Sequence, residues 1–289
     1  MKTLFFILGL IITYSSFSQK KIAKDHLISD LDFLADKYEK IHPNLYAYTS
    51  KDIFENKLQN LKNEFNDSIT SVDFWFKLAP IVNDLKHGHT RIETNQDEIG
   101  IMFEDFIKKG YKFLPFSIYV IDSIIYIQDI YTNVNGLKPG DIIFSINGNK
   151  SQDIISKLIG YKSGERYEYR LSYVERTFIW DFSFQFPSTS FEIEYLSNGQ
   201  LKKIELLGIT YEDTDKYSSE VFGALSDYTF DLIEDSIGII NYNACRKKEK
   251  FKRFLDSTFT TIQQKNIDYL IIDLRKNGGG NSDLNTFLF

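Results

Sequence analysis

The chain has 289 residues, and its 34 Lys and Arg against 40 Asp and Glu give a formal net charge of −6. This acidic surplus argues against a nucleic-acid binder, which needs basic side chains to neutralise phosphates. Hydrophobic residues make up 43% and charged residues 26%, as is typical of globular chains and not of disordered ones. The length predicts two domains of about 150 residues each, with one large domain as the alternative.

Residues 1–18 have the pattern of a secretory signal peptide. Lys2 precedes an apolar run from Leu4 to Thr13, and Ser16-Phe17-Ser18 places small residues at the cleavage positions. We expect cleavage before Gln19 and a mature protein in the periplasm or outside the cell. The apolar run is about half the length that spans a bilayer, so no stable membrane anchor is expected.

Residues 24–92 predict helices, because apolar side chains recur at spacings of three and four. These positions are Leu27, Leu31, Leu34, Tyr38, Ile41, Phe54, Leu58, Leu61, Phe65, Phe74, Leu78, Ile81, Val82 and Leu85. Turn residues at 42–44 and 66–68 separate the runs. We expect an N-terminal helical domain over residues 19–92, with His87-Gly88-His89-Thr90 where the last helix leads into a strand.

Residues 113–210 change to the period of strands. Apolar, β-branched and aromatic residues predict strands at 113–120, 124–127, 142–146, 191–195 and 203–206. Asn147-Gly148 and Ser197-Asn198-Gly199 predict tight turns, and a short helix is expected over 153–159. This segment predicts a β-rich domain.

Residues 228–289 predict a strand at 236–242, a helix with Phe251, Phe254, Leu255, Phe259 and Ile262 on one face, and an apolar strand at 269–274. A continuous apolar run is typical of a parallel strand buried on both faces, so this order indicates a right-handed βαβ unit. We expect the lone Cys245 to be a small buried residue. A further helix is expected from Ser282 or Asp283. Little of it precedes Phe289, so this α/β core is expected to be incomplete.

Three glycines, Gly278 to Gly280, follow the second of these strands at its carboxyl end, where open α/β sheets bind ligands. Such a loop exposes backbone amides, and with a helix starting just after it the loop suits an anion or an oxyanion. A plain strand-to-helix turn is the alternative. Nucleotide binding is poorly supported, because the Rossmann spacing requires glycine where Asp283 stands and no Gly-Lys-Ser/Thr ending occurs.

Three segments carry a resemblance to a known family. LIIDLRKNGGGNS, residues 270–282, resembles the D-L-R-x-N-x-G-G signature of the S41 family, the tail-specific or C-terminal processing serine peptidases. GLKPGDIIFSING, residues 136–148, is similar to a run of the PDZ-like domains that these peptidases carry. His87 to Thr90 resembles a D-G-H-T motif of exported members. The resemblance implies an α/β multidomain fold with an N-terminal helical domain over 19–92, a PDZ-like domain over 113–210 and a partial ClpP/crotonase-like peptidase core over 228–289.

The resemblance also implies site residues. His89 would be the catalytic general base, and an amide of Gly279 or Gly280 would form part of the oxyanion hole, roles that acyl transfer requires. Leu114, Pro115 and Phe116 are a candidate substrate-binding loop for a peptide carboxylate, with an apolar strand start as the alternative. The substrate would be a peptide or protein, captured through its C-terminus by strand addition. No cofactor and no metal are expected.

The sequence departs from the family pattern in two places. His87 stands where the motif has Asp, and it is either a partner of the site or, as we favour, a solvated side chain. The catalytic serine and its orienting acid are expected beyond the glycine loop, outside these 289 residues. No Gly-x-Ser-x-Gly elbow occurs, and Ser282 is expected to cap a helix.

Two hypotheses follow. The first is an exported S41-type serine endopeptidase, present here as a truncated chain that is inactive alone. The second is a non-catalytic protein that binds peptides or an apolar ligand through its PDZ-like module, with the S41-type core retained as a scaffold.

Overall fold

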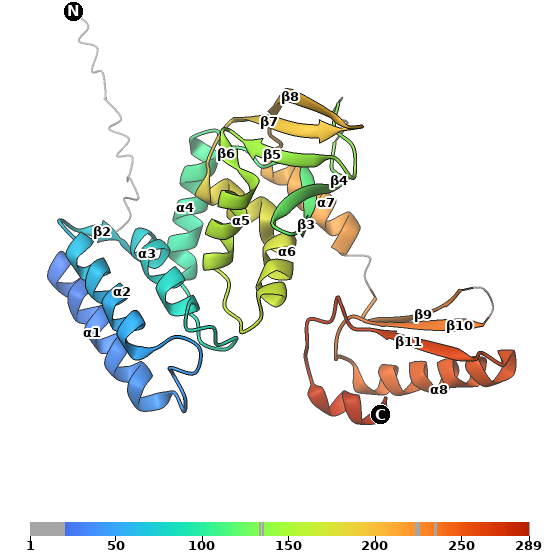
Figure 1. Cartoon of the computed structure of the whole chain (residues 1–289). Helices are drawn as coiled ribbons and strands as arrows, with labels where there is room; N and C mark the ends of the chain where they lie inside the picture. The colour runs from blue at the N-terminus through green and yellow to red at the C-terminus, as the bar shows by residue number, and fades with distance from the viewer. Residues whose placement is uncertain (1–20, 133, 135, 223–225, 234–235, 289) are drawn as a thin grey trace, which may run out of the picture. The chain divides into compact units, whose positions relative to one another are not determined.

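The computed structural model describes residues 21–288 except 133, 135, 223–225 and 234–235. The predicted signal peptide therefore lies outside the described residues. The chain divides into two units, residues 1–214 and residues 215–289. The described residues form a mixed α/β fold with several sheets, which is the fold class that the sequence predicts (Figure 1).

The N-terminal unit begins with the three predicted helices, α1 (Lys24–Ile41), α2 (Lys51–Glu64) and α3 (Ser71–Asn83). The hydroxyls of Ser50 and Thr70 cap α2 and α3 by accepting backbone N–H groups. A two-residue ladder joins β1 (Lys21–Ile22) to β2 (Ile69–Thr70). The apolar positions predicted from their spacing supply most of one hydrophobic cluster, which includes Leu27, Leu31, Phe54, Leu58, Leu61, Phe65, Leu78, Val82 and Leu85.

An antiparallel sheet follows. Its strands are β3 (Phe116–Ile121), β4 (Ile124–Ile130), β5 (Ile142–Ile146), β6 (Asn149–Lys150), β7 (Ser190–Ser197) and β8 (Gln200–Leu207). They lie in the order β3-β4-β5-β7-β8, with β6 paired to β5. Asn147 and Gly148 both have positive φ, so the predicted hairpin turn is confirmed.

Helices that the sequence analysis did not predict complete this unit. They are α4 (Gln96–Lys108), α6 (Tyr167–Gln185) and α7 (Tyr211–Phe222), the last of which crosses the division between the units. The predicted short helix is α5 (Ser151–Gly160). Side chains of α5 and α6 pack with the sheet in a second hydrophobic cluster, which contains Phe178, Phe182 and Phe191.

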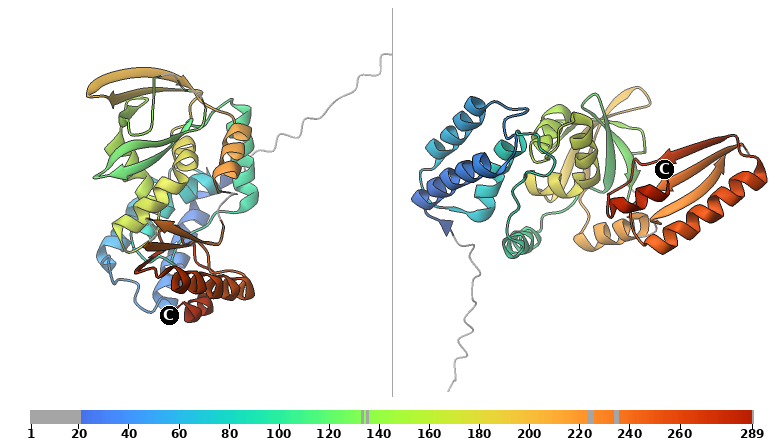
Figure 2. Two further views of the ribbon diagram at one scale, coloured as in Figure 1. Left: turned by 90° about the vertical axis from the view of Figure 1, so that its right-hand side faces the viewer. Right: turned by 90° about the horizontal axis from the view of Figure 1, so that it is seen from below.

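The C-terminal unit contains the predicted βαβ order. β10 (Ile237–Tyr242) and β11 (Tyr269–Asp273) are parallel and are joined by α8 (Lys248–Lys265), which lies along the sheet (Figures 1 and 2). An unpredicted strand, β9 (Tyr228–Ile233), pairs antiparallel with β10. Phe251 of α8 packs against Tyr228 and Tyr242, with ring centroids 5.1 and 4.7 Å apart.

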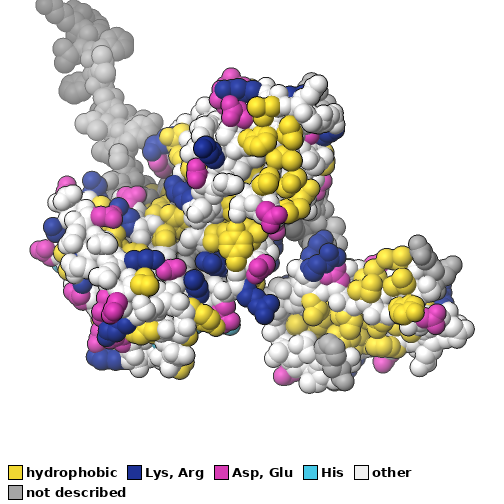
Figure 3. Space-filling model, viewed as in Figure 1, with side chains coloured by type: hydrophobic (Ala, Val, Ile, Leu, Met, Phe, Trp, Pro, Cys, Tyr) yellow, Lys and Arg dark blue, Asp and Glu magenta, His cyan; other side chains and the backbone are white. Residues whose placement is uncertain are grey.

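Two local predictions in this unit are wrong. Tyr269 and Ile271 of β11 are 68% and 49% exposed, because α8 covers one face of the sheet and no other described residue buries them. Hydrophobic side chains are accordingly visible on the surface of this unit (Figure 3). Ser282 is not a cap: Asn281 accepts the N–H of Asp283, and Ser282 begins the 3-10 helix η1 (Ser282–Phe287).

Within the described residues, no helix combines the length and apolar character needed to cross a membrane.

Candidate functional site

The glycine loop is fixed to the segment that follows β10. Gly278 donates its N–H to the Asn243 carbonyl at 3.1 Å, and the Cys245 N–H donates to the Gly279 carbonyl at 2.9 Å. The Asn281 N–H then donates to the Cys245 carbonyl, also at 2.9 Å. These hydrogen bonds hold the loop in one conformation at the carboxyl ends of β10 and β11.

The two candidate oxyanion glycines differ in their surroundings. Both have positive φ, +86° at Gly279 and +130° at Gly280, which favours glycine at both positions. The Gly279 N–H donates to Oδ1 of Asn277 at 2.7 Å, so it already has an acceptor. The Gly280 N–H has no acceptor among the described residues, and it is therefore the better candidate for binding a developing negative charge.

A cavity of about 350 Å³ lies beside this loop. Its lining includes Tyr242, Cys245, Asn277, Gly280 and Asn285. Burial raises the pKa of the Tyr242 phenol, whose hydroxyl donates to Oδ1 of Asn285 at 3.3 Å. Cys245 is 7% exposed, as the sequence analysis expects of a small buried residue. The cavity therefore offers neutral hydrogen-bonding groups next to the free amide.

Asp273 ends β11, and Arg275 holds its carboxylate in place. The Arg275 guanidinium donates three hydrogen bonds of 2.6 to 3.1 Å to the two carboxylate oxygens. These bonds, together with the backbone N–H of Arg275, lower the pKa of Asp273 to about 2. An ionised carboxylate thus precedes the glycine loop across the neutral pH range.

This arrangement predicts a specific pKa change. We expect Arg275→Gln to raise the pKa of Asp273 toward its ordinary value of about 3.9, because the charged donor is lost. Lys276→Gln should raise it much less, since Lys276 acts only at longer range. Because the folded-state pKa is lowered, the stabilisation is complete above the unfolded pKa and is lost as the pH falls toward 2. An NMR titration of the carboxyl carbon measures the pKa, and no change in Arg275→Gln would contradict the assignment.

The predicted base, His89, lies in the turn after α3 in the N-terminal unit. His89 is exposed, and its ring makes no hydrogen bond to the described residues. The turn itself is held by Ser163, whose hydroxyl bonds the carbonyls of His87 and Thr90. His89 and the glycine loop belong to different units, so their pairing stays a prediction.

His87 is not the solvated side chain that the sequence analysis favours. Its Nε2 lies 3.1 Å from the Leu45 carbonyl oxygen, and its ring centroid is 4.2 Å from that of His42 and 5.4 Å from that of Tyr48. The ring is partly buried in this group. His87 therefore anchors the turn that carries His89. In the described part of the chain, no three His, Cys, Asp or Glu side chains are grouped as a metal site would require.

The prediction that Leu114, Pro115 and Phe116 contact the substrate needs correction. Leu114 and Phe116 are both 0% exposed and belong to the core of the β-rich region. The Pro115 carbonyl accepts the N–H of Tyr131 at 2.8 Å, which ties the segment into the fold. The alternative, an apolar strand start, describes these side chains, and their prediction as substrate contacts is not supported.

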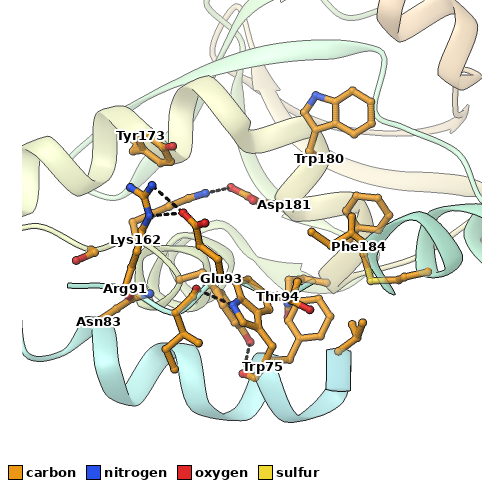
Figure 4. A pocket seen from close by; sticks show the side chains of 18 of the residues that line it. Trp75, Asn83, Arg91, Glu93, Thr94, Lys162, Tyr173, Trp180, Asp181 and Phe184 are labelled. Carbon is orange, nitrogen blue, oxygen red and sulfur yellow. Dashed lines mark hydrogen bonds and ion pairs between the residues drawn. The ribbon is translucent and has the colours of Figure 1, made fainter. Parts of the chain in front are cut away.

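The N-terminal unit contains a larger cavity of about 540 Å³, which was not predicted from the sequence (Figure 4). Its walls come from α3, α4, α6 and the segments after α3 and α5. Because two of these helices, α4 and α6, were not predicted, the cavity between them and α3 was not predicted either. The spacing of Leu171, Val174, Phe178 and Phe182 is a signal that could have revealed α6.

Comparisons with known proteins now place the C-terminal unit. Residues 236–285 match the model of Peptidase family S41, the family that the glycine-loop segment resembles in sequence. A search of curated proteins gives no significant match.

Solved structures of CPAF are similar in fold. A CPAF mutant aligns with a TM-score of 0.59 at 14% identity, over 90% of this chain and 57% of that one. Mature CPAF gives 0.56 at 14% identity, over 90% and 56% of the two chains. Its complex with lactacystin gives 0.57 at 15% identity, over 90% and 58%. The present chain thus spans less than two thirds of each of these proteins, and at these identities the likeness concerns the fold.

Proposed function

We propose that this chain is part of an exported serine endopeptidase of the S41 type, which hydrolyses peptide bonds by acyl transfer. The observation that carries the proposal is the glycine loop: it lies within the segment that matches the S41 family and presents the free N–H of Gly280 at the carboxyl end of a parallel strand. An amide fixed in this way stabilises the oxyanion of a tetrahedral intermediate. The peptidase family supports peptides or proteins as the substrates.

The roles of the remaining parts follow from this proposal. His89 is the general base that activates a serine hydroxyl, and a signal peptide over residues 1–18 directs export. Residues 19–92 form a helical domain, residues 113–210 a PDZ-like domain that receives the substrate's C-terminus, and residues 228–289 part of a ClpP/crotonase-like core. Each of the three ranges contains a hydrophobic cluster of its own, and the first two ranges lie within one compact unit, residues 1–214.

The 289 residues by themselves are proposed to be inactive. In the described part of the chain, no serine hydroxyl is hydrogen-bonded to a histidine ring, whereas a serine nucleophile needs such a base. Incubating the purified chain with a fluorophosphonate should therefore give no covalent adduct by mass spectrometry. An adduct on any serine would refute the inactivity.

The role of His89 is tested in a longer form of the protein that cleaves peptides. There, His89→Ala should lower kcat by a factor of about 10² to 10⁴, as expected when a general base is removed, while peptide binding is retained. His26→Ala, at an exposed histidine of α1, is the matched control and should leave kcat unchanged. Full turnover in His89→Ala would remove this residue from the mechanism.

A further inference from the structure

The 540 Å³ cavity of the N-terminal unit has aromatic walls. Trp75 of α3 stacks on Tyr161, with ring centroids 5.8 Å apart, and its Nε1 donates to the Ile92 carbonyl at 2.9 Å. Trp180 and Phe184 of α6 form the facing wall. Figure 4 shows Trp75, Trp180 and Phe184 around the cavity. Rigid aromatic walls held by hydrogen bonds favour a flat apolar ligand.

The charged groups at the cavity are paired with one another. The Lys162 ammonium lies 2.6 Å from Oδ2 of Asp181 and 4.9 Å from the ring centroid of Tyr173, and the Lys162 side chain is only 8% exposed. Arg91 lies 2.7 Å from Glu93. Figure 4 shows Lys162 and Asp181 reaching toward each other. Two cations thus face two anions, so the lining has no net charge to attract an ionic ligand.

One buried polar atom of the lining has no partner. Asn83 ends α3, is 4% exposed, and donates its Nδ2 to the Gly160 carbonyl at 3.2 Å. Its Oδ1 accepts no hydrogen bond from the described residues. Exchanging the amide oxygen and nitrogen would set two oxygens against each other, so the orientation is determined by Gly160. A buried acceptor left without a hydrogen bond destabilises the fold, and a ligand with an N–H or O–H group would supply the missing donor.

The geometry points to a binding site for an uncharged, flat aromatic molecule that carries a single N–H or O–H donor. The rings would pack between Trp75 and Phe184, and the donor would bond Oδ1 of Asn83. The volume of 540 Å³ lies within the range of about 300–1,000 Å³ that is usual for small-molecule sites. This inference does not rest on the proposed peptidase function, because all the residues involved belong to the N-terminal unit.

The chain offers a direct readout of binding. It contains two tryptophans, Trp75 and Trp180, and both line the cavity. N-phenyl-1-naphthylamine is a suitable probe, since it is uncharged, aromatic and has one N–H. On titration into the purified 289-residue chain, we expect saturable 1:1 binding that quenches the tryptophan emission by energy transfer to the probe. An absence of saturable quenching would overturn the proposal.

Two comparisons test the assigned contacts. The N-methylated probe lacks the N–H donor. Its Kd should be about three to ten times higher than that of the parent probe if Asn83 accepts a hydrogen bond from the parent's N–H. Thr94→Phe should fill the cavity and weaken binding at least about tenfold, whereas Thr189→Phe, at an exposed threonine of the same unit, should not. Equal affinity of the two probes, or unchanged binding in a folded Thr94→Phe chain, would contradict the assignment. The probe comparison needs no variant, so it decides the donor contact even if Thr94→Phe does not fold.

Discussion

Phe182→Ala should lower the free energy of unfolding of the N-terminal unit by about 3–5 kcal/mol, the usual cost of truncating a buried phenylalanine. Phe182 is 0% exposed and packs among three other rings, with centroids 5.5 Å from Phe178, 5.0 Å from Phe186 and 6.1 Å from Phe191. The contacts join α6 to β7, so the vacated space cannot close by moving one side chain. Urea denaturation followed by circular dichroism measures the loss.

Phe144→Ala provides the matched control. Phe144 lies in β5 of the same unit but is 47% exposed, so its truncation leaves no enclosed cavity and should cost less than about 1.5 kcal/mol. Comparable losses in the two variants would show that α6 does not pack on the sheet as described.

Gly280→Ala should destabilise the C-terminal unit by about 3 kcal/mol or more, because strain and a backbone clash coincide there. An added Cβ would lie 2.4 Å from the Cys245 carbonyl oxygen, and the φ of +130° is itself strained for alanine. To relieve the clash, the loop must separate from Cys245. The same change would displace the free amide, so an active form of the protein should also lose kcat.

Cys245 reports this separation, since it is the lone cysteine of the chain and is 7% exposed. Its reaction with Ellman's reagent should accelerate at least about tenfold in Gly280→Ala, in line with a local opening that is easier by over 1.4 kcal/mol. Gly278→Ala is the control: its φ is not in the left-handed region and its Cβ would meet no atom within 4 Å. Equal thiol reactivity in the two variants would contradict the close approach at Gly280.

Much of the fold could be predicted because local signals agreed with one another. In α2 the spacing of Phe54, Leu58 and Leu61 coincides with the Ser50 cap, and both indicate the same helix. The Asn147-Gly148 turn fixes the register between β5 and β6 through backbone conformation alone. The order of β10, α8 and β11 was predictable from one amphipathic segment between two apolar ones.

Two of the missed helices, α6 and α4, differ in the strength of their local signals. α6 is rich in tyrosine and phenylalanine, which are average helix formers at best, and apolar side chains occur on most sides of it. α4 has an Asn95 cap and apolar residues at 99, 102, 103 and 106, so its pattern was available. The burial of β11 depends on what covers the second face of the sheet, which the composition of a single strand does not specify.

The chemistry of the glycine-loop site was predictable from the sequence, whereas its details and the cavity at Asn83 were not. The glycine signature indicated an oxyanion site, but which amide is free depends on Asn277 accepting the N–H of Gly279. The unpaired Oδ1 of Asn83 depends on a carbonyl 77 positions away, at Gly160. Neither contact has a periodic or compositional signature, because both arise from tertiary packing.

The positions of the tryptophans and the cysteine have a practical consequence for folding studies. Trp75 and Trp180 belong to the N-terminal unit and Cys245 to the C-terminal one, so each unit carries its own intrinsic reporter. Emission spectra and thiol accessibility, recorded on one sample along one denaturant series, would follow the two units independently. Coincident midpoints would indicate a single cooperative transition, and separated midpoints would give the order in which the units melt.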